Sequence, residues 1–217
     1  MASSRSPQAR RRLSVDARRG AILEAASRVI AEHGPDSTSV EDVALAAGAS
    51  PALVHHYFGT RQDLIDHTLR RAADELLQRL RLDHRTPAAE QLAVGLTIYL
   101  DYVAEHSDSW VALLRAGRPG SDNAALIAAE VDEHAYRLAV RAVFPGRARP
   151  PAALTAALRG WIALVKECCL HWIEDGTLHR AALQALLSAS FVGCVQAAAA
   201  ADPSCQPALD RLVSTSP

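Results

Sequence analysis

The stretch TSVEDVALAAGASPALVHHYFGTRQDL, residues 38–64, decides the fold of this chain. Thr38 and Glu41 have the spacing of a capping box, which predicts that a short helix begins near Ser39. Gly48 then stands where a tight turn between two helices needs a residue that tolerates a positive φ. The segment therefore begins as a short helix followed by a glycine turn.

A second short helix is expected over about 51–57. Ser50 is a natural N-cap, and Pro51 is a natural first helical residue because it has no backbone N–H to satisfy. Val54 and Phe58 are four residues apart, so both should face back towards the first helix. The local signals together predict a helix-turn-helix.

This helix-turn-helix has two interpretations: a plain helical hairpin in a bundle, or a DNA-binding unit. The hairpin explains the glycine and the caps, but it does not explain the polar side chains of His55, His56, Tyr57 and Arg61. A DNA-reading helix needs compact donors and small apolar groups at its N-terminal end, with phosphate donors around it. The DNA-binding interpretation is therefore favoured.

The N-terminal segment 1–16 is expected to be a basic arm. The first twenty residues hold six arginines and one acid, Asp16, whereas the whole chain of 217 residues has a net charge of −1. Such a segment is either a nucleic-acid arm or a solvated tail, and its composition fits both. Arg10, Arg11 and Arg12 are included among the candidate DNA-binding residues.

The rest of the chain shows helical periodicity and no alternation typical of strands. Glycine and proline divide it into segments. Nine helices are expected at about 17–33, 39–47, 51–57, 61–82, 87–106, 108–117, 122–144, 151–175 and 179–201. An uninterrupted series of helices predicts an all-α protein.

The segment from Ile22 to Leu64 resembles the tetracycline-repressor (TetR) family. The similarity starts at Ile22–Ala26, continues through Glu32–Gly34, is densest from Thr38 to Leu64 and covers about a quarter of the chain. The resemblance implies an N-terminal three-helix DNA-binding domain, here 17–62. It also implies a C-terminal helical domain, 63–217, that binds a ligand and forms a two-fold dimer.

The resemblance also implies roles for individual residues of the helix-turn-helix. The helix at 51–57 would enter the major groove, with its N-cap Ser50 belonging to the DNA-binding set. The residues facing base edges would be Pro51, Ala52, Leu53 and His55. The residues meeting phosphates would be Thr38, Ser39, His56, Tyr57 and Arg61. Ala52 stands where the family commonly has Gly and His55 where it usually has Tyr, so no relative's operator can be carried over.

Two sets of apolar and aromatic residues are candidates for a ligand pocket. The ligand-binding candidates are Tyr99, Tyr102, Val103, His106, Trp110 and Leu114 on the helices after Pro87, and Trp161, Val165 and Cys168 within 151–175. Polar-tipped aromatics among aliphatic side chains are typical of a mostly apolar pocket, and equally of a helical core. The pocket interpretation predicts an apolar or aromatic effector.

The sequence argues against an enzyme. It contains no Glu-x-x-His pair, HExxH, P-loop, GxGxxG or GxSxG motif, so neither a metal nor a cofactor is expected. The cluster of Glu130, Asp132, Glu133 and His134 is interpreted as an exposed charged helix face. The four cysteines lack metal-ligand spacing and are expected to be buried thiols in a reducing compartment.

The chain is expected to act in the cytoplasm, with no membrane partner. The apolar run near the N-terminus is broken by Glu24 and Arg28, so no signal peptide is visible. The apolar stretch 188–201 is too short to span a bilayer and contains Gln196.

The function expected from these observations is ligand-controlled binding of double-stranded DNA. A homodimer would bind a palindromic operator, and a small molecule bound within 83–175 would weaken that binding, as repression relieved by a ligand is the usual case in the family. The alternative is an architectural DNA-binding protein with no ligand. Residues 83–217 are more than dimerisation requires, which favours a sensor.

The last long helix carries a pattern that predicts the dimer interface. Small residues recur every four positions, at Ala185, Ala189, Gly193, Ala197 and Ala201. Such a row forms a surface ridge, and a ridge of small side chains allows another helix to approach closely. A glycine inside a helix costs about 1 kcal/mol relative to alanine, so close packing would be a reason for Gly193.

Overall fold

The computed structural model describes residues 15–81, 86–116, 122–146 and 149–214. These residues form ten α-helices and one 3-10 helix and contain no strand, which confirms the predicted all-α class. The elements are α1 (Val15–His33), α2 (Val40–Ala46), α3 (Pro51–Phe58), α4 (Arg61–Arg79), α5 (Ala88–Glu105), α6 (Ser107–Ala116), α7 (Asp122–Val143), α8 (Ala152–Asp175), α9 (Arg180–Ala201), η1 (Pro203–Cys205) and α10 (Gln206–Val213).

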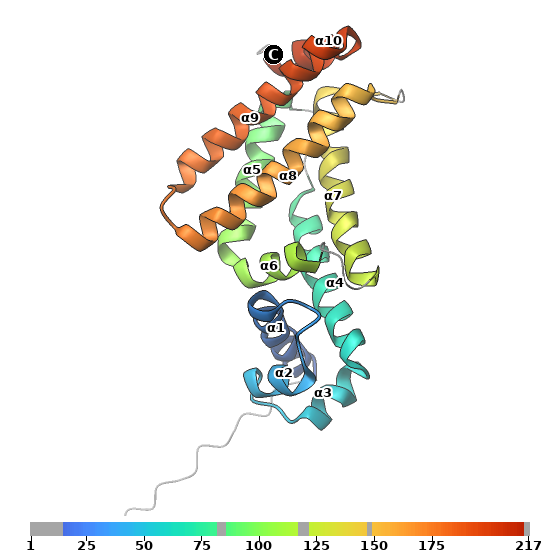
Figure 1. Ribbon diagram of the computed structural model, residues 1–217, viewed down its shortest axis with the longest axis vertical. Helices are drawn as coiled ribbons and strands as arrows, with labels where there is room; N and C mark the ends of the chain where they lie inside the picture. The colour runs from blue at the N-terminus through green and yellow to red at the C-terminus, as the bar shows by residue number, and fades with distance from the viewer. Residues whose placement is uncertain (1–14, 82–85, 117–121, 147–148, 215–217) are drawn as a thin grey trace, which may run out of the picture.

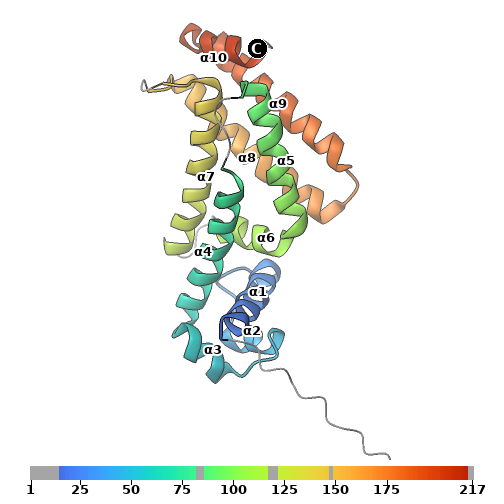
Figure 2. The ribbon, with the colours of Figure 1, turned by 180° about the vertical axis from the view of Figure 1, so that it is seen from behind.

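The helices form two groups joined by α4 (Figure 1). Helices α1, α2 and α3 lie at one end of the molecule, and α5 to α10 occupy the rest. Helix α4 begins beside α3 and extends into the larger group, where it packs along α7 (Figure 2). The N-terminal end of α4 thus belongs to the smaller group and its C-terminal end to the larger one.

Helix α10 was not expected, because the predicted helices end at residue 201 and Pro203 and Pro207 follow within six residues. Each proline lies in the first turn of its helix, η1 or α10, where a missing N–H costs no hydrogen bond. Helix α10 buries Ala208 and Leu212 against the body, and the Arg211 Nε donates to the Ala142 carbonyl at 2.9 Å.

The cap of α2 also differs from the expectation. Ser39 is the N-cap, because its hydroxyl oxygen accepts from the Asp42 N–H at 3.0 Å. The side chain of Thr38 is buried, and its hydroxyl donates to the Gly34 carbonyl at 2.8 Å. The capping box expected between Thr38 and Glu41 is therefore wrong by one residue, although the helix begins where it was predicted.

Buried apolar side chains fall into three clusters. One lies inside the α1–α3 unit and a large one lies inside the C-terminal group. The third, which we call the junction core, connects the two groups and draws side chains from α1, α4, α6 and α7. Its buried members are Ile30, Ile65, Leu69, Ala72, Ala73, Ala112, Leu113, Ala124 and Ile127. The position of the small domain is therefore set by apolar packing.

The turn between α2 and α3 provides a direct test of the local fold. Gly48 has a φ of 59°, and a Cβ added there would meet no atom within 4 Å. Gly48→Ala should lower the free energy of unfolding by about 1 kcal/mol through backbone strain alone. Gly48→Asn should cost less, because asparagine tolerates this conformation. Urea unfolding followed by circular dichroism measures both, and equal losses would contradict a backbone origin.

Candidate DNA-reading surface and ligand cavity

The α2–turn–α3 unit is built as the sequence predicted. Ser50 caps α3 by accepting from the Leu53 N–H at 3.2 Å, and Pro51 occupies the first turn. Val54 and Phe58 are buried against the rest of the domain. Because these two side chains fix the rotation of α3, the opposite side of the helix faces outwards.

The outward side of α3 carries most of the expected DNA-binding residues. Its exposed side chains are Ser50, Pro51, Ala52, His55 and His56, while Leu53 and Tyr57 are half-buried. The helix lies at the far end of the molecule from α9 and α10 (Figure 1). The expected DNA contacts of Arg10, Arg11 and Arg12 lie outside the described residues.

His55 is held in place by its own helix end. Its Nδ1 lies 2.7 Å from the Gly59 carbonyl oxygen, so in the neutral ring Nδ1 donates and Nε2 is left as an acceptor. The major groove offers amino-group donors on adenine and cytosine. An acceptor at Nε2 is compatible with such a donor, and the base contact of His55 stays a prediction.

Arg61 and Thr38, both expected at phosphates, are engaged inside the domain. The Arg61 guanidinium donates to three backbone carbonyls, those of Thr38 at 2.5 Å and of Pro35 and Asp36 at 2.6 Å each. These bonds fasten the loop before α2 to the first turn of α4. In the structure both residues support the α2–turn–α3 unit, which we call the reading head. Their phosphate contacts stay a prediction.

The start of α4 is fixed by a reciprocal capping box. The Thr60 N–H donates to the Asp63 carboxylate at 3.1 Å, and the Asp63 N–H donates to the Thr60 hydroxyl at 3.1 Å. Hydrogen bonds from Thr60 hold the pKa of Asp63 below its usual value. The carboxylate therefore stays ionised at the positive end of the helix dipole, where it is stabilised.

The C-terminal group encloses a cavity with about 1140 Å³ of empty space, part of it open to solvent. Helices α4 to α9 contribute its walls. Five of the nine ligand-binding candidates line it: Tyr99, Trp110, Leu114, Trp161 and Val165. Inside, the Trp110 Nε1 donates to the Tyr99 hydroxyl at 2.7 Å. Burial raises the pKa of Tyr99 well above its usual value, so the phenol stays neutral.

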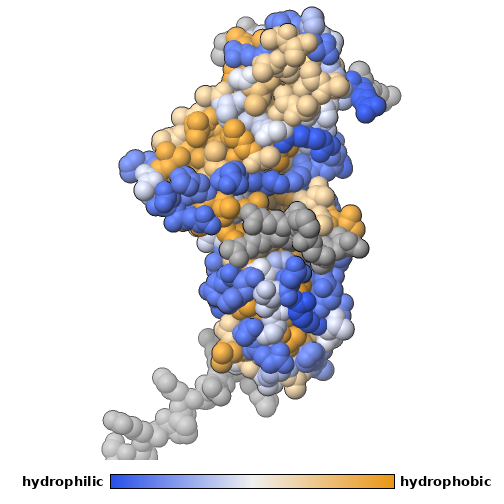
Figure 3. Space-filling model, in the orientation of Figure 1, coloured by the Kyte–Doolittle hydropathy of each residue, from blue (hydrophilic) through white to orange (hydrophobic). Residues whose placement is uncertain are grey.

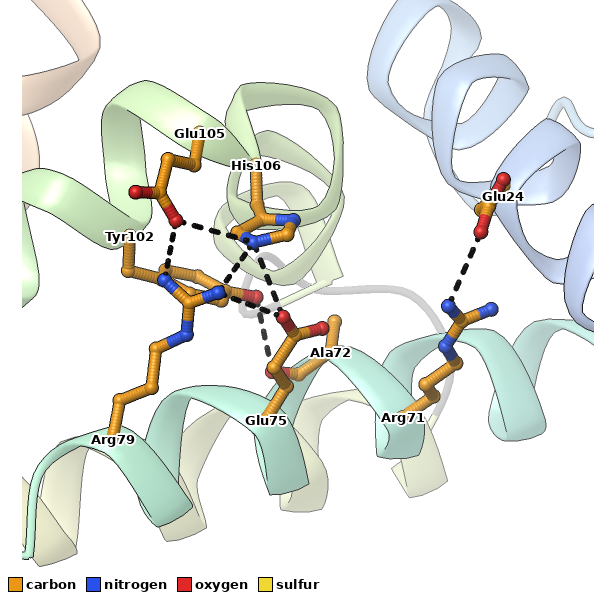
Figure 4. Close-up of polar contacts among 8 residues, drawn as sticks. All are labelled: Glu24, Arg71, Ala72, Glu75, Arg79, Tyr102, Glu105 and His106. Atoms are coloured by element: carbon orange, nitrogen blue, oxygen red, sulfur yellow. Dashed lines mark hydrogen bonds and ion pairs between the residues drawn. The ribbon is translucent and has the colours of Figure 1, made fainter.

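The other four candidates, Tyr102, Val103, His106 and Cys168, are not among the residues that line this cavity, and their expected place there needs correction. Tyr102 turns towards α4, and its hydroxyl donates to the Ala72 carbonyl at 3.1 Å (Figure 4). Val103 is fully buried in the large core, and Cys168 packs half-buried against it.

His106 belongs to a polar cluster between α4 and the end of α5 (Figure 4). Its Nε2 lies 3.1 Å from the Glu75 carboxylate, and Arg79 Nη1 lies 2.7 Å from the Glu105 carboxylate. The hydrogen bond from Arg79 lowers the pKa of Glu105. These residues tie two helices together outside the cavity.

The α7 wall of the cavity was missed. Asp132 was assigned to an exposed charged face, but it lines the cavity and pairs with Lys166 of α8 at 2.6 Å. Val131, Ala135 and Leu138 of the same helix also line the cavity. Their spacing of three and four residues was the available signal for a buried stripe.

Metal sites and membrane-spanning helices are two other classes of feature. In the part of the chain that the structure describes, no group of three His, Cys, Asp or Glu side chains is placed to hold a metal ion. Helix α9 is long and apolar enough to cross a membrane by length and composition, with 28% of its most apolar window buried. Its remaining apolar surface lies open on this chain.

The helix-turn-helix and the helical body that carries it define a DNA-binding regulator. Residues 22–68 match the family described as "Bacterial regulatory proteins, tetR family". Residues 88–194 match the family described as "Tetracyclin repressor-like, C-terminal domain". The chain therefore belongs to the TetR family of transcriptional regulators, as the motif at 38–64 predicted. Regulators of this family bind DNA and are not enzymes.

One relative and two solved structures illustrate the similarity in sequence and in fold. The HTH-type transcriptional regulator BetI of Agrobacterium fabrum is 46% identical over 66 residues, which span 30% of each chain. A TetR-family regulator from Streptomyces coelicolor shares 29% identity and superposes with a TM-score of 0.79 over 94% of this chain and 92% of its own. FadR from Bacillus subtilis, in complex with stearoyl-CoA, shares 17% identity over 81% of this chain and 96% of its own, with a TM-score of 0.61.

The three carbonyl contacts of Arg61 generate a prediction. Arg61→Ala should lower the free energy of unfolding by about 2 kcal/mol, because charge-assisted hydrogen bonds and loop support are lost together. Arg61→Lys keeps the charge but cannot reach three carbonyls with one planar group, so it should lose most of this stability too. Arg28→Ala, on the exposed face of α1, is the control. If Arg61→Lys matches the native protein in stability, the supporting role is wrong.

Proposed function

We propose that this chain is a ligand-responsive repressor that acts in the cytoplasm. A homodimer binds a palindromic operator, and a small apolar or aromatic effector in the cavity releases it. The observation that carries this proposal is that Leu113 contacts two regions at once. This side chain of α6 lines the cavity and also belongs to the junction core.

The junction core offers a route from the cavity to α3. Leu113 shares that core with Ile30 of α1 and Leu69 of α4, and α6 packs along α1. A ligand that displaces α6 favours a different placement of α1 and of the start of α4, which support α3. A ligand that prefers this second arrangement weakens DNA binding by the ratio of its affinities for the two.

The cavity favours this proposal over an architectural protein without a ligand, because a partly open, mostly apolar cavity lined by a few polar groups is typical of a small-molecule site. The stearoyl-CoA bound by FadR supports the view that the same fold accommodates a ligand with a long apolar body.

The exposed surface of α8 and α9 supports a dimer. The small residues predicted to form a ridge on α9, Ala185, Ala189, Gly193, Ala197 and Ala201, are all exposed in the single chain. On α8, Ala152, Ala156, Gly160 and Leu164 are exposed at the same spacing. Apolar side chains gather over these two helices (Figure 3). Two such helix pairs can pack closely and cover this surface.

The first test of this function is a footprint on fragments selected from the source genome. The protected site should be a palindrome with half-sites about one helical turn, or a multiple of it, apart. His55→Ala should relax preference at individual base pairs, each worth about 1–3 kcal/mol. His56→Ala, its neighbour, should weaken binding to all sequences equally. Protection of a single asymmetric half-site would refute the dimeric operator, and identical profiles for the two variants would refute the separation of roles.

The second test concerns the dimer. A Cβ at Gly193 would meet no atom within 4 Å in the single chain, so a larger side chain there does not disturb the fold itself. Gly193→Leu should therefore leave the helix content unchanged but push facing helices apart and favour monomers. Operator affinity should fall with it, whereas Gly193→Ala, the matched control, should stay dimeric. Size-exclusion chromatography with light scattering decides, and a dimeric, fully active Gly193→Leu protein would remove this face from the interface.

A further inference from the structure

The ion pair of Asp132 and Lys166 lies where the cavity meets a hollow on its outer side, a boundary that we call the opening. The two residues, on α7 and α8, line both the main cavity and an outer hollow bounded by α6, α7 and α8. Their charged atoms lie 2.6 Å apart, and their side chains are 32% and 37% exposed, with Lys166 the lower. The pair is therefore in contact with both spaces.

The charges around this opening are unbalanced. Of the described residues that line the main cavity, Asp132 and Lys166 are the two with a full charge. The outer hollow adds the exposed carboxylate of Glu167, so two carboxylates face one ammonium there. This excess attracts cations towards the opening.

The interior also suits a cation. Tyr99, Trp110, Trp161 and Phe191 line the cavity, and the rings of Trp161 and Phe191 meet edge to face with centroids 4.8 Å apart. Aromatic faces attract positive charge, most strongly where water is excluded. Burial is the main cause of the raised pKa of Tyr99, and the negative charge of Asp132 acts in the same direction.

Lys166 occupies the position that such a cation would take. Its ammonium, which pairs with Asp132, is carried on a long flexible alkyl chain. A lysine with this exposure can move its charge into water at little cost. An ammonium entering from solvent can then replace it at the carboxylate. A charge carried into an apolar cavity needs a counter-charge, which Asp132 supplies.

We propose that the effector is a monovalent organic cation with an apolar body, whose ammonium group displaces Lys166 from Asp132 while its body fills the aromatic-lined cavity. The proposal rests on the effector-controlled function above and names the chemical class of that effector. Asp132 is the specificity-determining residue, and Lys166 is its tethered competitor in the absence of ligand.

Three probes that share a phenylbutyl body test this assignment: 4-phenylbutylamine, 4-phenylbutanol and 4-phenylbutanoate. The amine is cationic at pH 7, the alcohol neutral and the carboxylate anionic. Two of the three tryptophans of the chain, Trp110 and Trp161, line the cavity, so their fluorescence reports binding. The amine should bind the full-length protein about tenfold more tightly than the alcohol, and the carboxylate should bind most weakly.

Variants assign this preference to the ion pair. Asp132→Asn should reduce the amine's affinity about tenfold and leave the alcohol's unchanged. Lys166→Met should raise the amine's affinity, because the tethered competitor is gone. Glu133→Gln is the matched control, since this neighbour pairs with Arg159 at 2.8 Å and does not line the cavity. It should bind all three probes as the native protein does.

The other outcomes overturn the assignment. Tightest binding by the carboxylate, lost in Lys166→Met, would show a site for anions. If the native protein and the variants bind all probes equally, or bind none of them, Asp132 and Lys166 do not discriminate ligands by charge. Release of operator DNA is measured separately with the same probes. Amine binding without release of DNA would refute effector control but not the cation site. Release of DNA by another apolar compound, with no dependence on Asp132, would refute the cation site but not effector control.

Discussion

The placement of α3, the helix of the candidate DNA-reading surface, depends on the junction core. Ile30 and Leu69 are completely buried there, and each apolar side chain of this size contributes about 1.5–3 kcal/mol when removed from water. A close-packed apolar core does not deform gradually, because opening a gap forfeits contacts on every side. The junction core therefore couples the position of α1 to those of α4, α6 and α7.

Polar contacts around this core guide the packing more than they stabilise it. Arg70 pairs with Glu130 at 2.6 Å, and Arg71 with Glu24 at 3.4 Å, both with largely solvated side chains. Exposed pairs of this kind contribute at most about 1 kcal/mol each. They restrict how α4 lies against its neighbours, whereas the free energy that resists displacement comes from the apolar side chains beneath them. A ligand that displaces α6 therefore has to overcome the free energy of this apolar packing.

The reading head could be predicted from the sequence because its signals are local. Ser50, Pro51 and Gly48 each act within one helical turn, and the structure places each in the expected role. Helix α10 was lost for a related reason: proline stops a helix that precedes it and starts one that follows it, and sequence alone does not say which. Apolar positions such as Leu212 could have indicated that these prolines start a further helix.

The cavity could be predicted only in part, because a helix packed on several sides has no single inner face. Tyr99 and Tyr102 lie one turn apart on α5, yet the first lines the cavity and the second bonds to α4. Asp132 looks like a surface residue until Lys166, 34 positions further on, is brought against it. The two charged side chains are each about one-third exposed and come from different helices, so their pairing exists only after folding. Local patterns therefore assign Asp132 to the surface, although in the folded chain it lines the cavity and pairs with Lys166.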